Sequence, residues 1–537
     1  MSPLPRHAVY SASLILFALV ISGCGKDEKT TVITQGGGSP PPAPTGLMAS
    51  SPGSGQVLLD WSFVPVATSY VVYWSSSPGV TQANGNPIPV FAPPFVHECL
   101  DNGTMHYYVV SAVNSSGEST ISVTEASATP YNRGILDPSF GGQGWVTHDS
   151  AALGYGADVG YGITADQAGR ILVAGYSRGP ADDEMAIWRY ESNGYLDATF
   201  GQSGVVIHGN AAGGNNDDVG RDIAVDSSGR IYVTGHSFSS GSTWMVVWCY
   251  DDAGVLDPSF GAGGIVTEPG AGGATAIGYA VEIDQTGKIV VAGLRDNGTD
   301  IDIAIWRYMP DGTPDGTFGS GGFVSHDGAA GGPDERGFDL TIDSANRIVV
   351  AGQGTGGVVA NAMIVWRFDS VGNIDSSFGS AGVAVYLIPG QSAIGDAVTI
   401  ESTGRILVAG SSINSGTGDL EMTIWAYDDT GTPEVSFGTG GIVNEVSPAG
   451  LPAECRGIAV DALGRIYVAG RGARPVGPRD MILWAFDSNG NPDPSFGSGG
   501  FVSHDDARGW ALILDACERV LVAGVSGGGD MALWRFH

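Results

Sequence analysis

Short apolar runs of four to six residues recur along most of the chain, and turns rich in Gly, Ser, Asp and Pro separate them. The first cycle has such runs at 161–165, 171–174, 185–190 and 205–208. None has the length or the period of a helix, so they predict β-strands. The same cycle returns until the end of the chain, which predicts an all-β fold built from repeated four-stranded units.

A Phe-Gly turn marks every copy of this cycle. It reads Asp-Pro-Ser-Phe-Gly or a close variant, and its Phe recurs at intervals of 60, 60, 58, 60, 59 and 59 residues. A four-stranded unit copied seven times fits one blade of a β-propeller per copy. The marker residues are Phe140, Phe200, Phe260, Phe318, Phe378, Phe437 and Phe496.

The two ends of the repeat region predict how the ring closes. The region opens with a Phe turn and a single strand at 145–148, and it stops at His537 directly after a third strand. Pairing the first strand with the last would complete the final blade and leave no long free edge. The sequence therefore predicts a seven-bladed β-propeller over residues 134–537.

The segment before the repeats has a different pattern. Over residues 43–130, short alternating apolar runs at 57–61, 70–74 and 107–113 are separated by turns at the spacing of a β-sandwich. We therefore expect a small, separate β-sandwich domain over residues 43–130.

Both regions resemble known families. The repeated Phe turn, over about 400 residues, resembles the delta-60 repeat family of bacterial surface and secreted proteins, whose function is largely uncharacterised. Residues 43–130 resemble a fibronectin type III module on the strength of the segments 44–47, 70–74 and 113–119 and of Trp61. Such modules serve as spacers or binding surfaces, and nothing in this one suggests catalysis.

The N-terminal residues have the pattern of an export signal. An apolar run at 8–21 follows Arg6 and is too short to span a bilayer, as is typical of a signal peptide. It ends at Ile21-Ser22-Gly23-Cys24, which resembles the lipobox of bacterial lipoproteins. The resemblance implies a signal peptide over 1–23, lipidation of Cys24 and a tether over 24–42. Gly25 favours the outer membrane, with exposure on the cell surface or toward the periplasm left open.

Charge and cysteine usage narrow the functional classes. The chain has 24 Lys and Arg against 56 Asp and Glu, a net charge of −32. This argues against nucleic-acid binding, which needs clustered cations. After Cys24, the four remaining cysteines lie far apart with no Cys-x-x-Cys pair, so we expect free, mostly buried thiols and no zinc site. They are Cys99, Cys249, Cys455 and Cys517.

One position in each repeat is a candidate for ligand binding. It lies five residues before the acid of the first hairpin, where the inner strand begins, and the ring places it at the mouth of the central channel. Aromatic rings with guanidinium and carboxylate groups suit a sugar or a peptide, although these side chains could also only plug the channel. The candidates are Tyr161, Arg221, Tyr279, Phe338, Asp396, Arg456 and Trp510.

No cofactor and no metal site is predicted, with one alternative left open. Calcium could be held by loop carboxylates, since hard cations prefer oxygen ligands. The acids considered for this role are Asp158, Asp182, Asp183, Asp217, Asp218, Asp334 and Glu335.

The sequence thus predicts a lipid-anchored protein of the cell envelope that acts as a non-catalytic binding or structural module. Its ligand would be a polysaccharide or an envelope protein at the variable-loop face of the propeller. The alternative is a propeller-type lyase or glycoside hydrolase acting on extracellular polysaccharide. A third hypothesis is a periplasm-facing scaffold for envelope assembly.

Overall fold

The computed structural model describes residues 39–537 except 54, 102, 131–133, 153–155, 214–215, 240, 357–358, 389–390 and 415. Within these residues the protein is all-β, and its one helical element is a short 3-10 turn, Ala271–Gly273. None of the helices in the described part is long and apolar enough to cross a membrane. Residues 1–38, which include Cys24 and the apolar run, lie outside the described residues.

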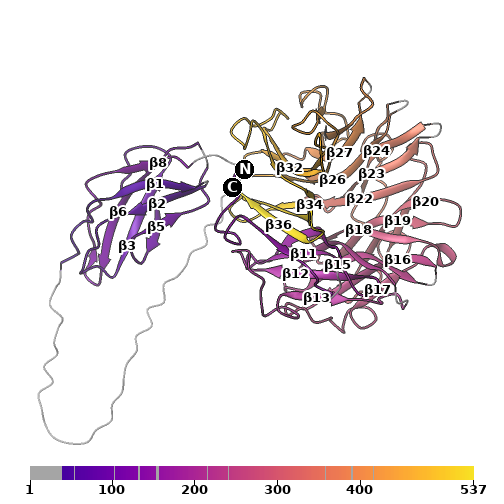
Figure 1. Cartoon of the computed structure of the whole chain (residues 1–537), viewed down its shortest axis with the longest axis horizontal. Helices are drawn as coiled ribbons and strands as arrows, with labels where there is room; N and C mark the ends of the chain where they lie inside the picture. The colour runs from indigo at the N-terminus through magenta and orange to yellow at the C-terminus, as the bar shows by residue number, and fades with distance from the viewer. Residues whose placement is uncertain are drawn as a thin grey trace, which may run out of the picture.

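The first eight strands form two antiparallel sheets (Figure 1). One contains β1, β2 and β5, and the other contains β4, β3, β6 and β7 with β8 added beside β6. Trp61, Tyr70 and Tyr108 pack in the core between them. The strands are β1 Met48–Gly53, β2 Gln56–Asp60, β3 Ser69–Ser75, β4 Asn86–Val90, β5 Phe95–His97, β6 His106–Asn114, β7 Gly117–Glu118 and β8 Ala126–Ala128.

The repeats form seven four-stranded antiparallel sheets within the described part of the chain. The first two sheets contain β10 Asp158–Ala165, β11 Ile171–Arg178, β12 Asp183–Tyr190 and β13 Val205–His208, and then β14 Asp218–Val225, β15 Ile231–Ser239, β16 Ser242–Tyr250 and β17 Ile265–Glu268. The third and fourth sheets contain β18 Ala276–Ile283, β19 Ile289–Asp296, β20 Ile301–Tyr308 and β21 Phe323–His326, and then β22 Glu335–Ile342, β23 Ile348–Gly356, β24 Val359–Phe368 and β25 Val383–Tyr386. The fifth and sixth sheets contain β26 Ala393–Ile400, β27 Ile406–Ile413, β28 Leu420–Tyr427 and β29 Ile442–Glu445, and then β30 Ala453–Val460, β31 Ile466–Gly472, β32 Asp480–Phe486 and β33 Phe501–His504.

The last sheet joins the two ends of the repeat region. It contains β34 Ala507–Leu514, β35 Val520–Ser526 and β36 Met531–Phe536, and its fourth strand is β9 Trp145–His148. Trp534 of β36 pairs with Trp145 of β9. The first strand of every sheet contacts the first strand of the next, and β34 contacts β10, so the sheets follow one another around a closed ring (Figure 1).

Apolar side chains between neighbouring sheets form the core of the ring. The Trp of each third strand is buried, as is the Phe of each marker turn. Trp248, for example, packs against Ile187 and Phe200 of the preceding sheet. These contacts explain why one Trp and one Phe recur in every repeat. The buried tryptophans are Trp188, Trp248, Trp306, Trp366, Trp425, Trp484 and Trp534.

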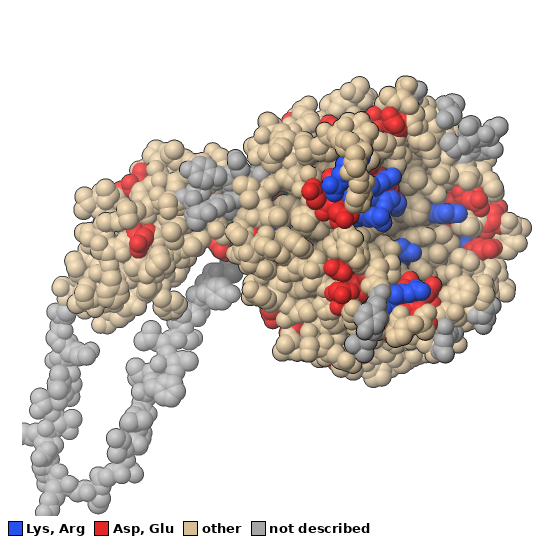
Figure 2. Space-filling view, in the orientation of Figure 1, with Lys and Arg blue, Asp and Glu red and all other residues tan. Residues whose placement is uncertain are grey.

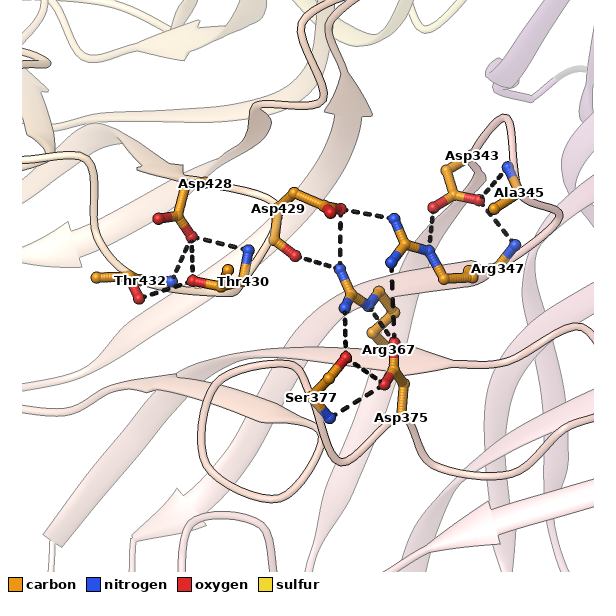
Figure 3. A network of polar contacts seen from close by, with 10 residues as sticks. All are labelled: Asp343, Ala345, Arg347, Arg367, Asp375, Ser377, Asp428, Asp429, Thr430 and Thr432. Carbon is orange, nitrogen blue, oxygen red and sulfur yellow. Dashed lines mark hydrogen bonds and ion pairs between the residues drawn. The ribbon is translucent and has the colours of Figure 1, made fainter.

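Arginines of the third strands add polar contacts between sheets (Figure 3). The Nε of Arg367 donates to Asp375 Oδ2 of its own sheet at 2.8 Å, and its Nη1 donates to the backbone carbonyl of Asp429 in the next sheet. Arg347 also donates to Asp429, at 2.6 Å. The guanidinium group of an arginine on one sheet thus binds partly to a turn of the next sheet. This contact helps to fix the angle between the two sheets.

The first hairpin of each sheet keeps one turn conformation even where its sequence changes. Gly169 has a φ of 77°, in the left-handed region that glycine adopts most easily. Asn346 and Glu518 stand at the corresponding positions of their repeats with φ values of 62° and 57°. The departure from glycine at Glu518 therefore leaves the turn unchanged.

The cysteine prediction was wrong for two of the four thiols. Cys99 and Cys517 form a disulfide that links the small domain to the last sheet of the ring, 418 residues apart in sequence. Cys249 and Cys455 are free and buried, as expected. Spacing along the chain can reveal cysteines that pair within one loop or motif. It cannot reveal two cysteines that come together only when the domains fold.

Candidate functional site

The seven candidate residues all occupy β-bulges. In β10, Gly160 pairs with Gly175 and Gly162 pairs with Ala174, which leaves Tyr161 without a partner on β11. A bulge bends the strand and re-aims the side chain of the extra residue. The same shift occurs in each sheet. The extra residues, called the channel-mouth residues below, are Tyr161, Arg221, Tyr279, Phe338, Asp396, Arg456 and Trp510.

A glycine opposite each bulge explains why the bulge recurs. A Cβ added at Gly175 would lie 1.7 Å from the carbonyl oxygen of Val159 on the neighbouring strand, so no other residue fits there. The equivalent glycines meet the same carbonyl at 1.9 to 2.1 Å. In each second strand this glycine is the last residue of a Val-Ala-Gly sequence or a close variant of it. Its recurrence is the sequence signal for the bulges. The equivalents are Gly235, Gly293, Gly352, Gly410, Gly470 and Gly524.

All seven channel-mouth residues line one cavity of about 440 Å³ at the centre of the ring. The structure therefore brings together every candidate residue, although their role in binding remains a prediction. Figure 2 shows basic side chains in the hollow of the ring, with acidic groups beside them. The cavity is lined by two of the chain's 24 cationic residues, Arg221 and Arg456, together with three aspartates.

Arg221 is the least neutralised of these cations. Its guanidinium carbon lies 4.7 Å from the centre of the Tyr161 ring and 5.9 Å from that of Tyr279. Its Nε is buried and has no hydrogen-bond partner, and no carboxylate of the described residues forms an ion pair with it. Stacking between two aromatic rings leaves the edge of the guanidinium available for an anion.

The second arginine of the mouth, Arg456, is paired. Its Nη1 lies 2.6 Å from Asp396 Oδ1 and its Nη2 lies 3.7 Å from Glu454. Arg471 and Arg479 also bind Glu454, so three guanidinium groups share two carboxylates. Burial raises the pKa of Asp396 to about 6, although Arg456 opposes this effect. This side of the mouth has one unmatched positive charge.

Below the mouth lie three carboxyl groups that the sequence analysis did not single out. Asp222 accepts a hydrogen bond from the Val281 amide of the next sheet at 2.8 Å, and Asp339 accepts one from Val398 at 2.7 Å. Burial raises the pKa of Asp222 to about 6 and that of Asp339 to about 7. Glu282 lies near both, and burial with these two neighbouring charges raises its pKa to about 8. These acids tie the first strands together.

Two further side chains on second strands lie near Arg221. The ring centre of Tyr176 is 6.0 Å from that of Tyr161. Burial, with a smaller contribution from the Arg221 charge, lowers the pKa of His236 to about 3. His236 is therefore a neutral imidazole at neutral pH, and its buried Nδ1 has no hydrogen-bond partner. Both residues directly follow the glycine of their second strand, but the residue type at this position changes from repeat to repeat, so the repeat alone did not single them out.

Several loop acids considered for calcium already have protein partners. Asp158 accepts a hydrogen bond from Ser177, and Asp218 accepts two from the backbone amides of Asn210 and Ala211. The carboxylate of Asp334 accepts one from the Ile301 amide. Asp183 pairs with Arg178 at 2.7 Å. Glu335 differs from these acids and is treated below.

Comparisons with known proteins identify the type of repeat. The family described as "Domain of unknown function (DUF5122) beta-propeller" matches residues 169–200, 285–318 and 346–378, and a family described as "Beta-propeller repeat" matches residues 209–240. The chain therefore carries β-propeller repeats. No curated protein matches it.

Solved structures resemble both parts of the chain. An Fn3-like protein from Clostridium thermocellum is 31% identical over 17% of this chain and 93% of its own, with a TM-score of 0.15. Polysaccharide lyase Uly1 is 11% identical over 70% of this chain and 89% of its own, with a TM-score of 0.40. A PL25 ulvan lyase is 12% identical over 75% of this chain and 94% of its own, with a TM-score of 0.33.

The lyase matches correct one expectation. The prediction that the chain is not an enzyme is contradicted, because two solved structures that match 70% and 75% of the chain are polysaccharide lyases. At 11% and 12% identity the likeness concerns the fold alone. Any activity has to be argued from the residues of the channel.

Proposed function

We propose that this protein binds an acidic polysaccharide at the mouth of the channel of a seven-bladed, delta-60-type β-propeller. Residues 43–130 would be a fibronectin type III-like spacer. The lipobox-like sequence supports an anchor at Cys24 and a place in the outer membrane. The Cys99–Cys517 disulfide supports a location outside the cytoplasm, because such bonds persist in oxidising compartments.

The observation that carries the proposal is the environment of Arg221. A guanidinium with a buried, unpartnered Nε and no carboxylate partner among the described residues suits a carboxylate or sulfate group of a sugar. The rings of Tyr161, Tyr279 and Trp510 line the same cavity and offer faces on which sugar rings stack. A cavity of about 440 Å³ has room for a short segment of a chain rather than a whole polymer.

Binding should follow the charge of the ligand. We expect uronate-containing polysaccharides to bind the full chain and neutral ones to bind far more weakly, with the affinity falling as salt is added. Arg221→Gln should remove most of the binding. Arg178→Gln, a change at an arginine that is 47% exposed and paired with Asp183, is the matched control and should leave binding intact. Equal binding by the Arg221 variant and the control would refute the proposal.

A second candidate function is cleavage of the same polymer by β-elimination. The observation that favours it is that the His236 imidazole, whose Nδ1 has no hydrogen-bond partner, lies near Arg221. A base would take the proton from C5 of a uronate, the electron pair would form the C4=C5 bond, and the glycosidic oxygen at C4 would leave with a proton from an acid such as Tyr161. Arg221 would neutralise the carboxylate, which makes the C5 proton more acidic.

The two candidates differ in their products. Cleavage creates an unsaturated uronate with a new ultraviolet absorbance, whereas binding alone creates none. Tyr161→Phe keeps the ring for stacking and removes the hydroxyl group. A lyase should therefore lose turnover and keep binding in this variant, as it should in His236→Gln. Binding without any rise in absorbance on a panel of uronate polymers would leave only the binding function.

A further inference from the structure

Three carboxylates from two neighbouring sheets lie close together. Asp302 is in β20, Asp327 follows β21, and Glu335 begins β22 of the next sheet. One oxygen from each lies within 4.8 Å of the others. Two oxygens bound on opposite sides of one calcium ion, each about 2.4 Å away, are about 4.8 Å apart. The cluster therefore has the size of a single coordination sphere.

Two of these side chains are buried without the partners that buried carboxylates need. Glu335 is 0% exposed and Asp302 is 6% exposed. Neither oxygen of Glu335 has a hydrogen-bond partner, and Asp302 Oδ1 has none. The amides of Gly328 and Ala329 face Glu335 without reaching hydrogen-bonding geometry, and the second oxygen of Asp302 accepts one bond of 3.1 Å from Asn297. An unpartnered buried carboxylate is costly, and a bound cation would satisfy all three acids at once.

The equivalent positions in other sheets show what a satisfied acid looks like. Asp158 and Asp218 stand where Glu335 does, and each accepts hydrogen bonds from loop amides and from a serine of the second strand. The residue of β23 that pairs with Glu335 is Gly354, which has no hydroxyl group. Compared with Asp158 and Asp218, Glu335 has a longer side chain and no serine on the second strand to donate a hydrogen bond to it.

A second pair of acids shows the alternative in which an arginine supplies the positive charge. Asp480 and Asp505 stand where Asp302 and Asp327 do, on either side of the pair formed by Met481 and His504. Arg474 lies 2.6 Å from Asp480 and 4.0 Å from Asp505. At the other site, Arg295 is near Asp302 but forms no ion pair with it among the described residues.

We propose that Asp302, Asp327 and Glu335 bind one calcium ion, which ties the connection between β21 and β22 to the sheet before it. The donors are all oxygens, which hard cations prefer over the nitrogen and sulfur donors typical of zinc. Three carboxylates supply up to six oxygens, and Ca²⁺ tolerates the irregular geometry of such a set better than Mg²⁺ does. None of the three acids lines the channel cavity, so the site does not depend on the proposed function.

Titration of the full chain, first stripped of metal by a chelator, tests this site. Calorimetry should show one Ca²⁺ per chain, and Ca²⁺ should raise the melting temperature. Glu335→Gln should weaken binding by at least about tenfold, because even outer-shell substitutions at metal sites cost that much. Asp505→Asn, at the acid next to Arg474, is the matched control and should bind Ca²⁺ as the unaltered chain does.

Asp327→Asn is the second test, since this residue is exposed and its substitution should not disturb folding. It should weaken Ca²⁺ binding as Glu335→Gln does. Absence of binding to the unaltered chain, or unchanged binding in both variants, would overturn the proposal. Tighter binding of Mg²⁺ than of Ca²⁺ would overturn the choice of ion.

Discussion

Replacing Arg367 by Ala tests whether buried arginines hold neighbouring sheets together. The side chain is 2% exposed and bonds to Asp375, to Ser377 and to the turn at Asp429, and it stacks over Phe378 at 4.7 Å. The variant would leave Asp375 without its closest cation. Figure 3 shows the contacts with Asp375, Ser377 and Asp429 converging on one guanidinium.

The expected cost follows from the burial of the pair. Removing one partner of a buried ion pair costs about 3 to 5 kcal/mol of unfolding free energy. Asp375 is 17% exposed and Arg347 remains 4.0 Å from it, so both reduce the penalty. We therefore expect Arg367→Ala to lower the free energy of unfolding by about 3 kcal/mol, at the low end of that range.

Urea unfolding followed by tryptophan fluorescence measures this, because every sheet of the ring has a buried tryptophan in its third strand. The double variant R367A/D375N removes the unpaired charge and keeps an oxygen to accept the 3.0 Å bond from the Ser377 amide, so it should be more stable than R367A alone. Arg178→Ala, at an exposed arginine, is the control and should leave the midpoint unchanged. A midpoint for R367A equal to that of the control would refute the reasoning, as would a double variant less stable than the single one.

Two further predictions concern the channel acids and the disulfide. The pKa of Glu282 is raised to about 8 in the folded protein. The folded state therefore keeps the proton of this carboxyl at pH values where the unfolded chain has lost it. The free energy of unfolding should fall as the pH rises from about 4 to 8. Glu282→Gln should therefore gain stability relative to the unaltered protein between pH 5 and pH 9, measured as the difference in urea midpoint; a constant difference would contradict the raised pKa. Mass spectrometry of a proteolytic digest made without reductant should detect a peptide in which Cys99 is joined to Cys517. Detection of the two cysteines in separate, alkylated peptides would contradict that bond. Cys249 and Cys455 should react with an alkylating agent only after unfolding, since both are buried.

The repeat made the strand order and the position of the candidate site predictable from the sequence. A period close to 60 residues and a Phe turn in each copy are local signals repeated seven times, and they predict the strands of each sheet. The single strand at the start of the region and the three strands at its end predict how the last sheet is completed. The same repetition identified one residue per inner strand, and all seven line the cavity. The sequence analysis did not predict that these residues are bulged, although the glycine opposite each is a local signal of it, because it has no Cβ.

Contacts between different repeats were decided only by the tertiary structure. The Cys99–Cys517 bond and the cluster formed with Glu335 unite residues that share no position in the repeat. Asp222 and Asp339 do share one, directly after a channel-mouth residue, but their burial and their bonds to the next sheet appear only in the ring. Their chemistry depends on which side chains face one another across sheets and on how much water reaches them. Periodicity places a residue on a strand and a face, whereas burial and partners arise only when the sheets pack into a ring.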